Sequence, residues 1–360
     1  VFAVAKKLGI KGLKIGVVSG DNILGRIREF ESQNIAMKSM DTGESLYDLM
    51  KQGNEIMSAN AYISSKPLVE ALEKGAQVII AGRTTDTGLA MAPMVYEFGW
   101  SWNDWNKLAA GTVAGHIIEC GAQCTGGNFT RWRDVPDMWN IGYPVVEAHP
   151  DGTFFITKHD GTGGLVSVDT ISEQLLYEMG DPHAYITPDV IADFTSIRLE
   201  QNGKDRVKVF GIQGKPPTEF FKVSASYLKG YKASGQLTIS GPDALDKAKL
   251  AAEVLWKRLE RAGITFDDPS TEFLGVNSCH DGIVTIPQQV NEVVLRIGVK
   301  DKDKNKVDRF GKEIAPLVTS GPPGVTGFAG GRPKPQEIVA FFPALIPKHL
   351  IKTEVTVEEV

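Results

Sequence analysis

Cysteine is scarce in this sequence, with three among 360 residues. Small disulfide-built domains carry cysteine in even numbers and at high density. The odd, sparse count therefore argues against a disulfide framework and favours a reducing compartment. Long apolar runs are also missing, since no stretch reaches the roughly 18 apolar residues of a membrane-spanning helix. We expect a cytoplasmic protein with no membrane partner.

An excess of charge of one sign is lacking too. Lys and Arg number 39 and Asp and Glu number 44, which leaves a net charge of −5. The charges are evenly spread, so a nucleic-acid partner is not expected. Hydrophobic residues (42%) and charged residues (23%) occur at ordinary levels for a globular protein. The length suggests two domains, or one large α/β domain with an appendage.

Two nucleotide-binding patterns are absent from the glycine-rich loops at 159–167 and 319–335. Neither loop matches G-x-G-x-x-G after a strand, and neither contains GK[ST]. A standard dinucleotide site and a P-loop are thus unsupported, and no cofactor is firmly predicted. The second loop ends in "GGRPKP", where backbone amides with Arg332 and Lys334 are able to cradle a phosphate, as in the tail of coenzyme A. A long ordered surface loop explains these residues equally well.

Strand and helix patterns alternate in the first part of the chain. Short apolar runs predict buried strands at 13–19, 60–63 and 76–82. Helices are predicted after each of them, at 22–32, at 64–75 with Ser65 as N-cap, and from "TTDTG" onward. This alternation predicts a parallel, Rossmann-like α/β sheet with helices on both faces, over a first domain at 1–140.

The alternation of strand and helix patterns ends at about residue 140, and a mixed or antiparallel α+β domain is predicted at 141–360. Strand-like alternation surrounds polar turns there, and "EQNGKD" contains the Asn-Gly signal of a β-hairpin. Two strand-then-helix units follow, beginning with "GQLTIS" and with "VVLRIGV". Side by side, they would form a sheet with helices on one face, and a true duplication remains open.

The stretch "GHIIECGAQCTGGNF" concentrates reactive side chains. His116, Cys120 and Cys124 follow one another at i, i+4 and i+8, nearly along one line of a helix. A zinc site needs ligand pairs from different elements, and no CxxC or second His pair completes one, so no metal is predicted. Cys120 with His116 as base is a chemically sensible nucleophile. Burial as small apolar residues explains both cysteines as well, and we favour it for Cys124.

Glu119 is the carboxylate of the same stretch. Its apolar neighbours would raise its pKa toward acid–base work, although an ion-paired structural carboxylate fits the same surroundings. The residues Gly126, Gly127 and Asn128 follow at once, and glycines at a helix end let backbone amides approach a ligand closely. Plain turns are built in the same way.

Polar residues also follow two of the predicted strands. The sequence "AGRTTDTG" contains Arg83 and Asp86 at the carboxyl end of a strand, the edge where open α/β sheets bind ligands. Arg83 would hold an anion, and Asp86 would orient the Arg83 side chain. In the alternative, Thr85 or Asp86 is a helix N-cap and Arg83 is solvated. The corresponding "VVSGDN" places Asp21 and Asn22 at the same rim.

One further run, "NSCHDG", contains His280 and Asp281. Neighbours in sequence point in different directions, so this Cys-His-Asp run is not a catalytic triad. Either His280 or Asp281 alone is able to face a pocket.

Four long blocks resemble the acyclic terpene utilisation AtuA family. Spread over residues 70–335, they are "EALEKGAQVIIAGRTTDTGLAMAPMVYEFGW", "LAAGTVAGHIIECGAQCTGGNF", "VSVDTISEQLLYEMGDPHAYITPDVIADF" and "EIAPLVTSGPPGVTGFAGGRPKP". The resemblance implies a setting among enzymes that degrade branched acyl-CoA compounds such as geranyl-CoA. It also implies a further strand–helix segment before Val1 and a small ferredoxin-like domain or subunit as partner. Cys124 stands where members often have an aliphatic residue, which weakens a two-thiol scheme.

The residues and the resemblance together predict an enzyme, or a catalytic subunit, that acts on a branched acyl-CoA thioester. Hydration–dehydration or C–C lyase chemistry is expected, with Glu119 as acid–base group and His116 as its partner. Arg83 would anchor the substrate anion, and the Gly126 and Gly127 amides would polarise a carbonyl. Acyl transfer by Cys120 is a second reading. A non-catalytic subunit that docks the ferredoxin-like protein is a third, and a homo-oligomer is expected in each case.

Overall fold

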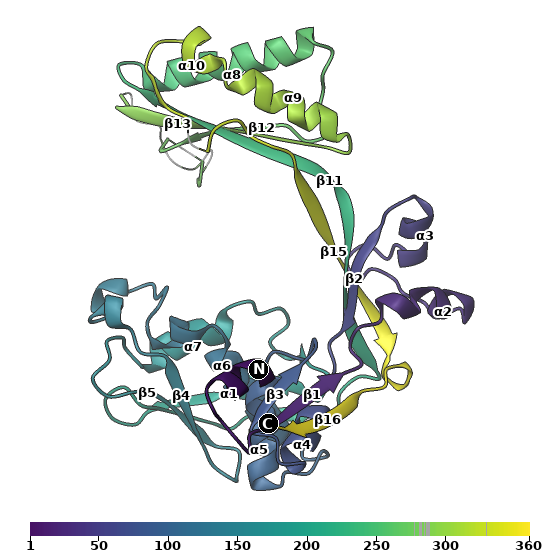
Figure 1. Cartoon of the computed structure of the whole chain (residues 1–360). Coiled ribbons are helices and arrows are strands. Elements are labelled where there is room, and N and C mark those ends of the chain that lie inside the picture. The colour runs from purple at the N-terminus through teal and green to yellow at the C-terminus, as the bar shows by residue number, and fades with distance from the viewer. Residues whose placement is uncertain (277, 281–282, 284, 286–288, 329) are drawn as a thin grey trace. The chain divides into compact units, whose positions relative to one another are not determined.

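The computed structural model describes residues 1–276, 278–280, 283, 285, 289–328 and 330–360. Contacts divide the chain into two units (Figure 1). Unit 1 comprises Val1–Leu49, Ser58–Ala225 and Phe342–Val360, and unit 2 comprises Met50–Met57 and Ser226–Phe341. The division does not fall after residue 140, because the strands between residues 144 and 215 pack within unit 1. No helix in the described ranges has the length and apolar composition needed to cross a membrane.

A three-stranded sheet in unit 1 has the order β16-β1-β3. β1 (Lys14–Ser19) pairs in parallel with β3 (Val78–Ala81) and antiparallel with β16 (Glu354–Glu359). Two predicted strands are thus confirmed. The third, expected at 60–63, is β2 (Ile56–Ala61), and it pairs with β11 (Phe220–Ser240) instead of joining the parallel pair. A Rossmann-like sheet is therefore not confirmed; the fold is mixed α/β.

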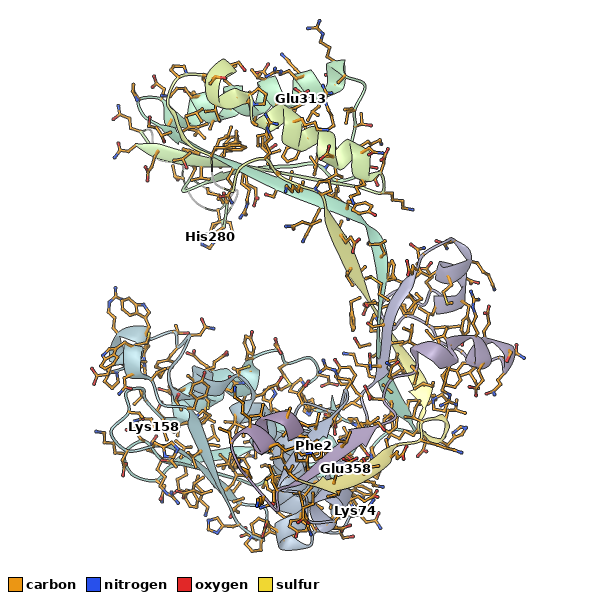
Figure 2. The ribbon with its side chains drawn as sticks, in the orientation of Figure 1. Phe2, Lys74, Lys158, His280, Glu313 and Glu358 are labelled. Atoms are coloured by element: carbon orange, nitrogen blue, oxygen red, sulfur yellow. The ribbon has the colours of Figure 1, made fainter. Side chains whose placement is uncertain are left out.

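Seven helices lie in the unit 1 part of the described chain, the last two residues of α3 excepted. They are α1 (Phe2–Lys7), α2 (Ile27–Ser32), α3 (Leu46–Lys51), α4 (Lys66–Glu73), α5 (Gly88–Phe98), α6 (Trp105–Glu119) and α7 (Val168–Leu176). α4 lies against β1, β3 and β16. Lys74, labelled in Figure 2, donates from Nζ to Glu70 Oε1 at 2.7 Å and to the Val355 carbonyl at 2.9 Å. This lysine ties the end of α4 to β16.

The α4 N-terminus is capped differently from the prediction. Ser65 precedes the helix as expected, but its side chain makes no capping hydrogen bond. Its backbone N–H and its Oγ instead donate to Asp189 Oδ2, each at 2.9 Å. The Asp189 carboxylate, which is distant in sequence, therefore accepts the hydrogen bonds at the start of α4. The local sequence pattern does not reveal this partner.

Two antiparallel sheets complete unit 1. The first has the order β4-β5-β9-β8, from β4 (Pro144–Ala148), β5 (Phe154–Lys158), β8 (Arg198–Gln201) and β9 (Val207–Phe210). The second has the order β10-β7-β6, from β6 (Tyr185–Ile186), β7 (Ile191–Asp193) and β10 (Gln213–Lys215). The predicted Asn-Gly hairpin is the β8–β9 connection, where Gln201 pairs with Val207. The antiparallel character expected after residue 140 is confirmed.

Unit 2 is a sheet with helices on one face, as Figure 1 shows. After β11, its elements are α8 (Ala244–Arg261), β12 (Ser270–Leu274), β13 (Glu292–Asp301), α9 (Lys304–Ile314), α10 (Leu317–Ser320), β14 (Val325–Gly327) and β15 (Gln336–Pro347). The strand order β12-β13-β11-β14, with a helix after β11 and after β13, is the split βαβ arrangement of ferredoxin-like folds. The two predicted strand-then-helix units are β11–α8 and β13–α9. Their apolar faces meet in one core, which includes Leu237, Leu255 and Phe310.

Candidate functional site

Asp21 holds together the ends of three strands in unit 1. Its buried carboxylate accepts hydrogen bonds through Oδ2 from Asn60 Nδ2 and from the Arg83 backbone N–H, both at 2.7 Å. A Cβ at Gly82 would lie 1.8 Å from Asp21 Oδ1, so this close approach requires glycine. Asp21 is thus engaged within the fold. Asn22 is exposed, and its Oδ1 accepts from the Leu24 N–H at 3.0 Å.

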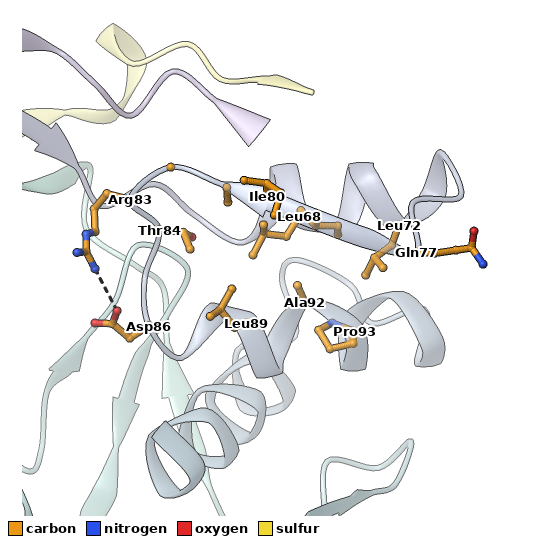
Figure 3. Close-up of a pocket in the computed structure, with 13 residues that line it drawn as sticks. Leu68, Leu72, Gln77, Ile80, Arg83, Thr84, Asp86, Leu89, Ala92 and Pro93 are labelled. Atoms are coloured by element: carbon orange, nitrogen blue, oxygen red, sulfur yellow. Dashed lines mark hydrogen bonds and ion pairs between the residues drawn. The ribbon is translucent and has the colours of Figure 1, made fainter. Parts of the chain in front are cut away.

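Arg83 and Asp86 lie together on the loop that follows β3. Arg83 Nη1 is 3.4 Å from Asp86 Oδ1, and both side chains are about half exposed, at 47% and 51%. The guanidinium also lies over the Tyr62 ring, 5.2 Å from its centroid. Figure 3 shows the pair at one end of a cavity of about 540 Å³, with Gln77 at the other end and a mostly apolar wall between them that includes Leu68 and Pro93. The guanidinium is oriented yet remains accessible to an anion.

The close packing of α6 on α5 brings Asp86 near Glu119. A Cβ at Gly115 would lie 2.5 Å from the Thr87 carbonyl oxygen, so the helices approach this closely because residue 115 has no side chain. Asp86 lies two residues before the start of α5, and Glu119 is the last residue of α6. The two carboxylates line one cavity of about 340 Å³, together with Leu89, Ala90, Gly115 and Ile118.

Partial loss of hydration and two neighbouring carboxylates change the pKa of Glu119. Glu119 is exposed at the end of α6, but neighbouring protein atoms remove part of its hydration and raise the pKa of its carboxyl above the ordinary 4.5. The negative charges of Asp86 and then Glu178 raise it further. A raised pKa brings a carboxyl group closer to the range in which acid–base catalysis is efficient.

His116 faces the protein interior rather than this cavity. The residue is buried, with 3% of its surface exposed, and its Nε2 lies 3.1 Å from the Gln174 carbonyl oxygen. Its ring packs edge-on against Tyr185 and Phe194, with centroids 5.4 and 5.2 Å away. Burial lowers the pKa of the imidazole and so favours its neutral form. These contacts give His116 a positioning role.

Tyr185 and Glu178 are two residues of this region that sequence reasoning missed. Burial raises the pKa of the Tyr185 hydroxyl to about 12, and the charges of Glu119, Asp86 and Glu178 add to the shift. The Tyr185 ring is also held by Phe194, at 4.8 Å between centroids. A pair of acidic and aromatic residues far along the chain carries no local pattern, so no signal in the sequence marked either one.

The three cysteines lie in different surroundings. α6 ends at Glu119, Cys120 is its C-cap, and Cys124 lies in a following 3-10 turn, so the predicted line of side chains along one helix stops at Glu119. Cys120 is partly exposed and Cys279 is exposed. Cys124 is fully buried, and burial raises the pKa of its thiol to about 12, which excludes a thiolate near neutral pH.

The glycines after α6 close a turn. The Gly126 N–H donates to the Gln123 carbonyl at 3.2 Å, and the Gly127 N–H donates to the Ala122 carbonyl at 2.8 Å. Both amides are therefore already engaged, and the expectation that they polarise a substrate carbonyl is corrected. Asn128 is exposed and has a positive φ of 57°.

Predicted residues of unit 2 lie on its surface. Arg332, Lys334 and His280 are exposed, and Figure 2 labels His280. The other residue predicted there, Asp281, lies outside the described residues. In the ranges that the structure describes, no group of three or more His, Cys, Asp or Glu side chains is arranged to hold a metal ion.

The comparison with family models places this chain. The model of the acyclic terpene utilisation family protein AtuA matches residues 1–357, nearly the whole sequence. The chain therefore belongs to the AtuA family, which is tied to acyclic terpene utilisation. Searches of the curated proteins and of the solved structures gave no match.

Proposed function

We propose that this chain is an enzyme, or the catalytic subunit of one, in terpenoid catabolism. Its reaction is acid–base hydration–dehydration or C–C cleavage of a branched acyl-CoA thioester, with Glu119 as the acid–base group. The observation that carries this proposal is the meeting of Asp86 and Glu119 in one cavity, where the pKa of Glu119 is raised. Family membership supplies the metabolic setting.

The chemistry explains why such a carboxyl group is needed. Both reactions move a proton to or from carbon next to a thioester carbonyl, and a positioned acid–base group contributes roughly 10²–10⁴-fold to such a step. Arg83 anchors an anionic group of the substrate, since Asp86 and the Tyr62 ring orient its guanidinium. Leu89, Ala90 and Ile118 give the cavity an apolar wall beside Glu119, against which a branched acyl chain would pack.

Binding is tested first, by thermal shift with free coenzyme A and with branched acyl-CoA thioesters. A ligand at a hundredfold excess over its dissociation constant stabilises the native state by about 2.7 kcal/mol. A raised melting temperature with the thioesters supports the substrate class. No shift with any of these compounds would contradict it and would favour the non-catalytic partner role.

Catalysis is tested with Glu119→Gln. This variant keeps the shape of the cavity and removes the proton donor, so turnover should fall by roughly 10²–10⁴-fold while the thermal shift is retained. Glu97→Gln is the matched control, because Glu97 is exposed on α5 and does not line this cavity. If Glu119→Gln turned over the substrate as fast as the control, Glu119 would not be the acid–base residue.

Acyl transfer through Cys120 is the second candidate, favoured by the partial exposure of this thiol next to Glu119. The thiolate would attack the thioester carbonyl and release coenzyme A, leaving an acyl group on Sγ. Cys120→Ser separates the two candidates. Full activity of this variant ends the acyl-transfer reading, and complete loss with an intact fold would replace Glu119 by Cys120 as the central residue.

A further inference from the structure

The cavity of about 540 Å³ in unit 1, here called the large cavity, lies along the edge of β3. Its apolar wall comes from three elements: Leu68 and Leu72 on α4, Leu89, Ala92 and Pro93 on α5, and residues 79–81 of β3. Residues three or four apart share one face of a helix, so α4 and α5 each turn an apolar face to the cavity. Figure 3 shows these side chains between the Arg83–Asp86 pair at one end and Gln77 at the other.

Part of this apolar wall is in contact with water. β3 is an edge strand, since the sheet order is β16-β1-β3, and Ile80 on β3 is 46% exposed. Leu89, at the start of α5, is 64% exposed. Large apolar side chains that gather in one open cavity are typical of a surface that a ligand or a partner covers. The composition of the wall indicates a hydrocarbon as the group that covers it.

Two residues join the large cavity to the cavity of about 340 Å³ around Glu119, here called the Glu119 cavity. Asp86 and Leu89 line both of them. Leu89 is followed on α5 by Ala90, which lines the Glu119 cavity, and by Ala92, which lines the large cavity. A chain that packs beside Glu119 therefore reaches the large cavity by passing over Leu89. This continuity identifies the hydrocarbon as the acyl chain of the proposed substrate.

The volume of the large cavity indicates the length of that chain. A cavity of roughly 150 Å³ holds benzene, which has six carbons, so about ten carbons need about 250 Å³ in the same proportion. The large cavity offers about 540 Å³, which also leaves room for methyl branches. An acyl group of about four carbons that reacts beside Glu119 would leave this volume unfilled.

We propose that the large cavity binds the hydrocarbon end of a long acyl chain, of about ten carbons, whose thioester lies in the Glu119 cavity. Ile80 and Leu89 are then specificity-determining residues, because Ile80 contacts the far part of the chain and Leu89 the part between the two cavities. The inference rests on the proposed function for the position of the thioester. It adds a preference for long acyl chains over short ones.

The expected size of this preference follows from the burial of the chain. Each methylene that is fully buried contributes about fourfold to affinity, and a chain half covered in an open cavity gains about twofold per carbon. Six further carbons therefore give about 60-fold. Isothermal titration calorimetry with saturated acyl-CoA thioesters of about four to ten carbons measures this span. Saturated thioesters carry neither the double bond nor the hydroxyl group of the reaction, so binding is measured without turnover.

Ile80→Gln and Val17→Gln form a matched pair of variants. Val17 lies opposite Ile80 in the parallel ladder of β1 and β3 and is 39% exposed, but it is not among the residues that line the large cavity. Ile80→Gln should weaken binding of the ten-carbon thioester roughly fivefold or more and leave that of the four-carbon thioester unchanged. Val17→Gln should bind both like the wild type. Leu89→Gln should weaken both, because Leu89 lines both cavities.

Steady-state kinetics on branched 2-enoyl-CoA thioesters give a second readout. Ile80→Gln should raise KM for the ten-carbon substrate and leave kcat unchanged, because the variant alters a contact with the chain and not the reacting atoms. The melting temperature should stay that of the wild type, since the Ile80 side chain is about half exposed. A purely structural role of Ile80 would change the melting temperature and would affect short and long substrates alike.

The remaining outcomes separate this inference from the proposed function. Equal affinity for four and ten carbons, with turnover that Glu119→Gln abolishes, overturns the chain site and keeps the proposed function. Affinity that rises with chain length equally in the wild type and in Ile80→Gln places the chain elsewhere and also overturns the chain site. The predicted binding without any turnover keeps the chain site and overturns the proposed chemistry.

A second copy of this chain is the competing occupant of the β3 edge. Analytical ultracentrifugation of the wild type, Ile80→Gln and Val17→Gln tests it. A dimer that Ile80→Gln alone dissociates, together with affinity that does not depend on chain length, would show that the edge is an interface between copies and would overturn the inference. An unchanged oligomeric state in both variants, with the predicted loss of long-chain binding in Ile80→Gln, supports the acyl chain.

Discussion

Gly115→Ala is expected to destabilise the protein by forcing α5 and α6 apart. The added Cβ would lie 2.5 Å from the Thr87 carbonyl oxygen and 2.7 Å from the Thr87 Cα. Both are backbone atoms, so no side-chain rotation relieves the contact. Ordinary contact begins near 3.4 Å, and α5 must therefore move by about 1 Å within a close-packed interior.

The magnitude follows from two opposed effects. Overpacking against atoms that cannot move costs about 3 kcal/mol, the upper end of the usual range. Alanine is favoured over glycine inside a helix by about 1 kcal/mol, which leaves a net loss of about 2 kcal/mol. Each kcal/mol shifts the melting temperature of a unit of this size by about 2–4 °C. Gly115→Ala should therefore melt about 4–8 °C below the wild type.

Gly111→Ala is the matched control on the same helix. Its Cβ would lie 2.6 Å from Met91 Cγ, which a change of rotamer can move, but 3.0 and 3.2 Å from Met91 Cβ and Cα, which need shift by only a few tenths of an ångström; the loss should therefore be smaller than for Gly115→Ala. Differential scanning calorimetry of the three proteins measures both effects. A Gly115→Ala variant as stable as the wild type, or equal losses for both variants, would refute the account of this helix contact.

Three further predictions concern Cys124, Asp21 and His116. Cys124 should resist a thiol reagent until the protein unfolds, because burial holds its pKa at about 12, whereas the exposed Cys279 should react at once; mass spectrometry of labelled peptides distinguishes them. Asp21→Ala should lower the unfolding free energy by about 3 kcal/mol in urea titrations, since two hydrogen bonds to a buried carboxylate are lost; an unchanged midpoint would contradict this. Burial lowers the pKa of His116, so the unfolded chain takes up a proton below about pH 6.5 that the folded protein refuses; stability should fall from there toward the lower folded pKa, and His116→Gln should remove that part of the decline.

Patterns within short windows were sufficient for much of the fold. The β1 and β3 strands, the Asn-Gly hairpin and the two strand-then-helix units of unit 2 are local features, and all of them are present. The family resemblance was equally secure, because long blocks of sequence carry it. Burial of Cys124 also agrees with the reading that we favoured for it. Each of these rests on neighbouring residues, whose spacing sets their faces and turns.

Partners at a distance were decided by the tertiary structure. β16 joins β1 from the other end of the chain, and β2 pairs with β11 rather than entering a parallel sheet. His116 sits near Glu119 in sequence, yet its hydrogen bond goes to Gln174, 58 residues away. The spacing of residues on a helix indicates which side chains share a face, but it cannot say what that face meets.

For the candidate site too, the sequence indicated the residues and the tertiary structure decided which of them meet. Glu119 as an acid–base residue and the Arg83–Asp86 pair are proposals that the sequence alone raised. That Asp86 lines the same cavity as Glu119 depends on the close approach of two helices at Gly115. The sequence therefore identified Glu119, Arg83 and Asp86 as residues with suitable chemistry. Their meeting follows from long-range packing, because a pKa depends on which charges and which apolar walls the fold brings together.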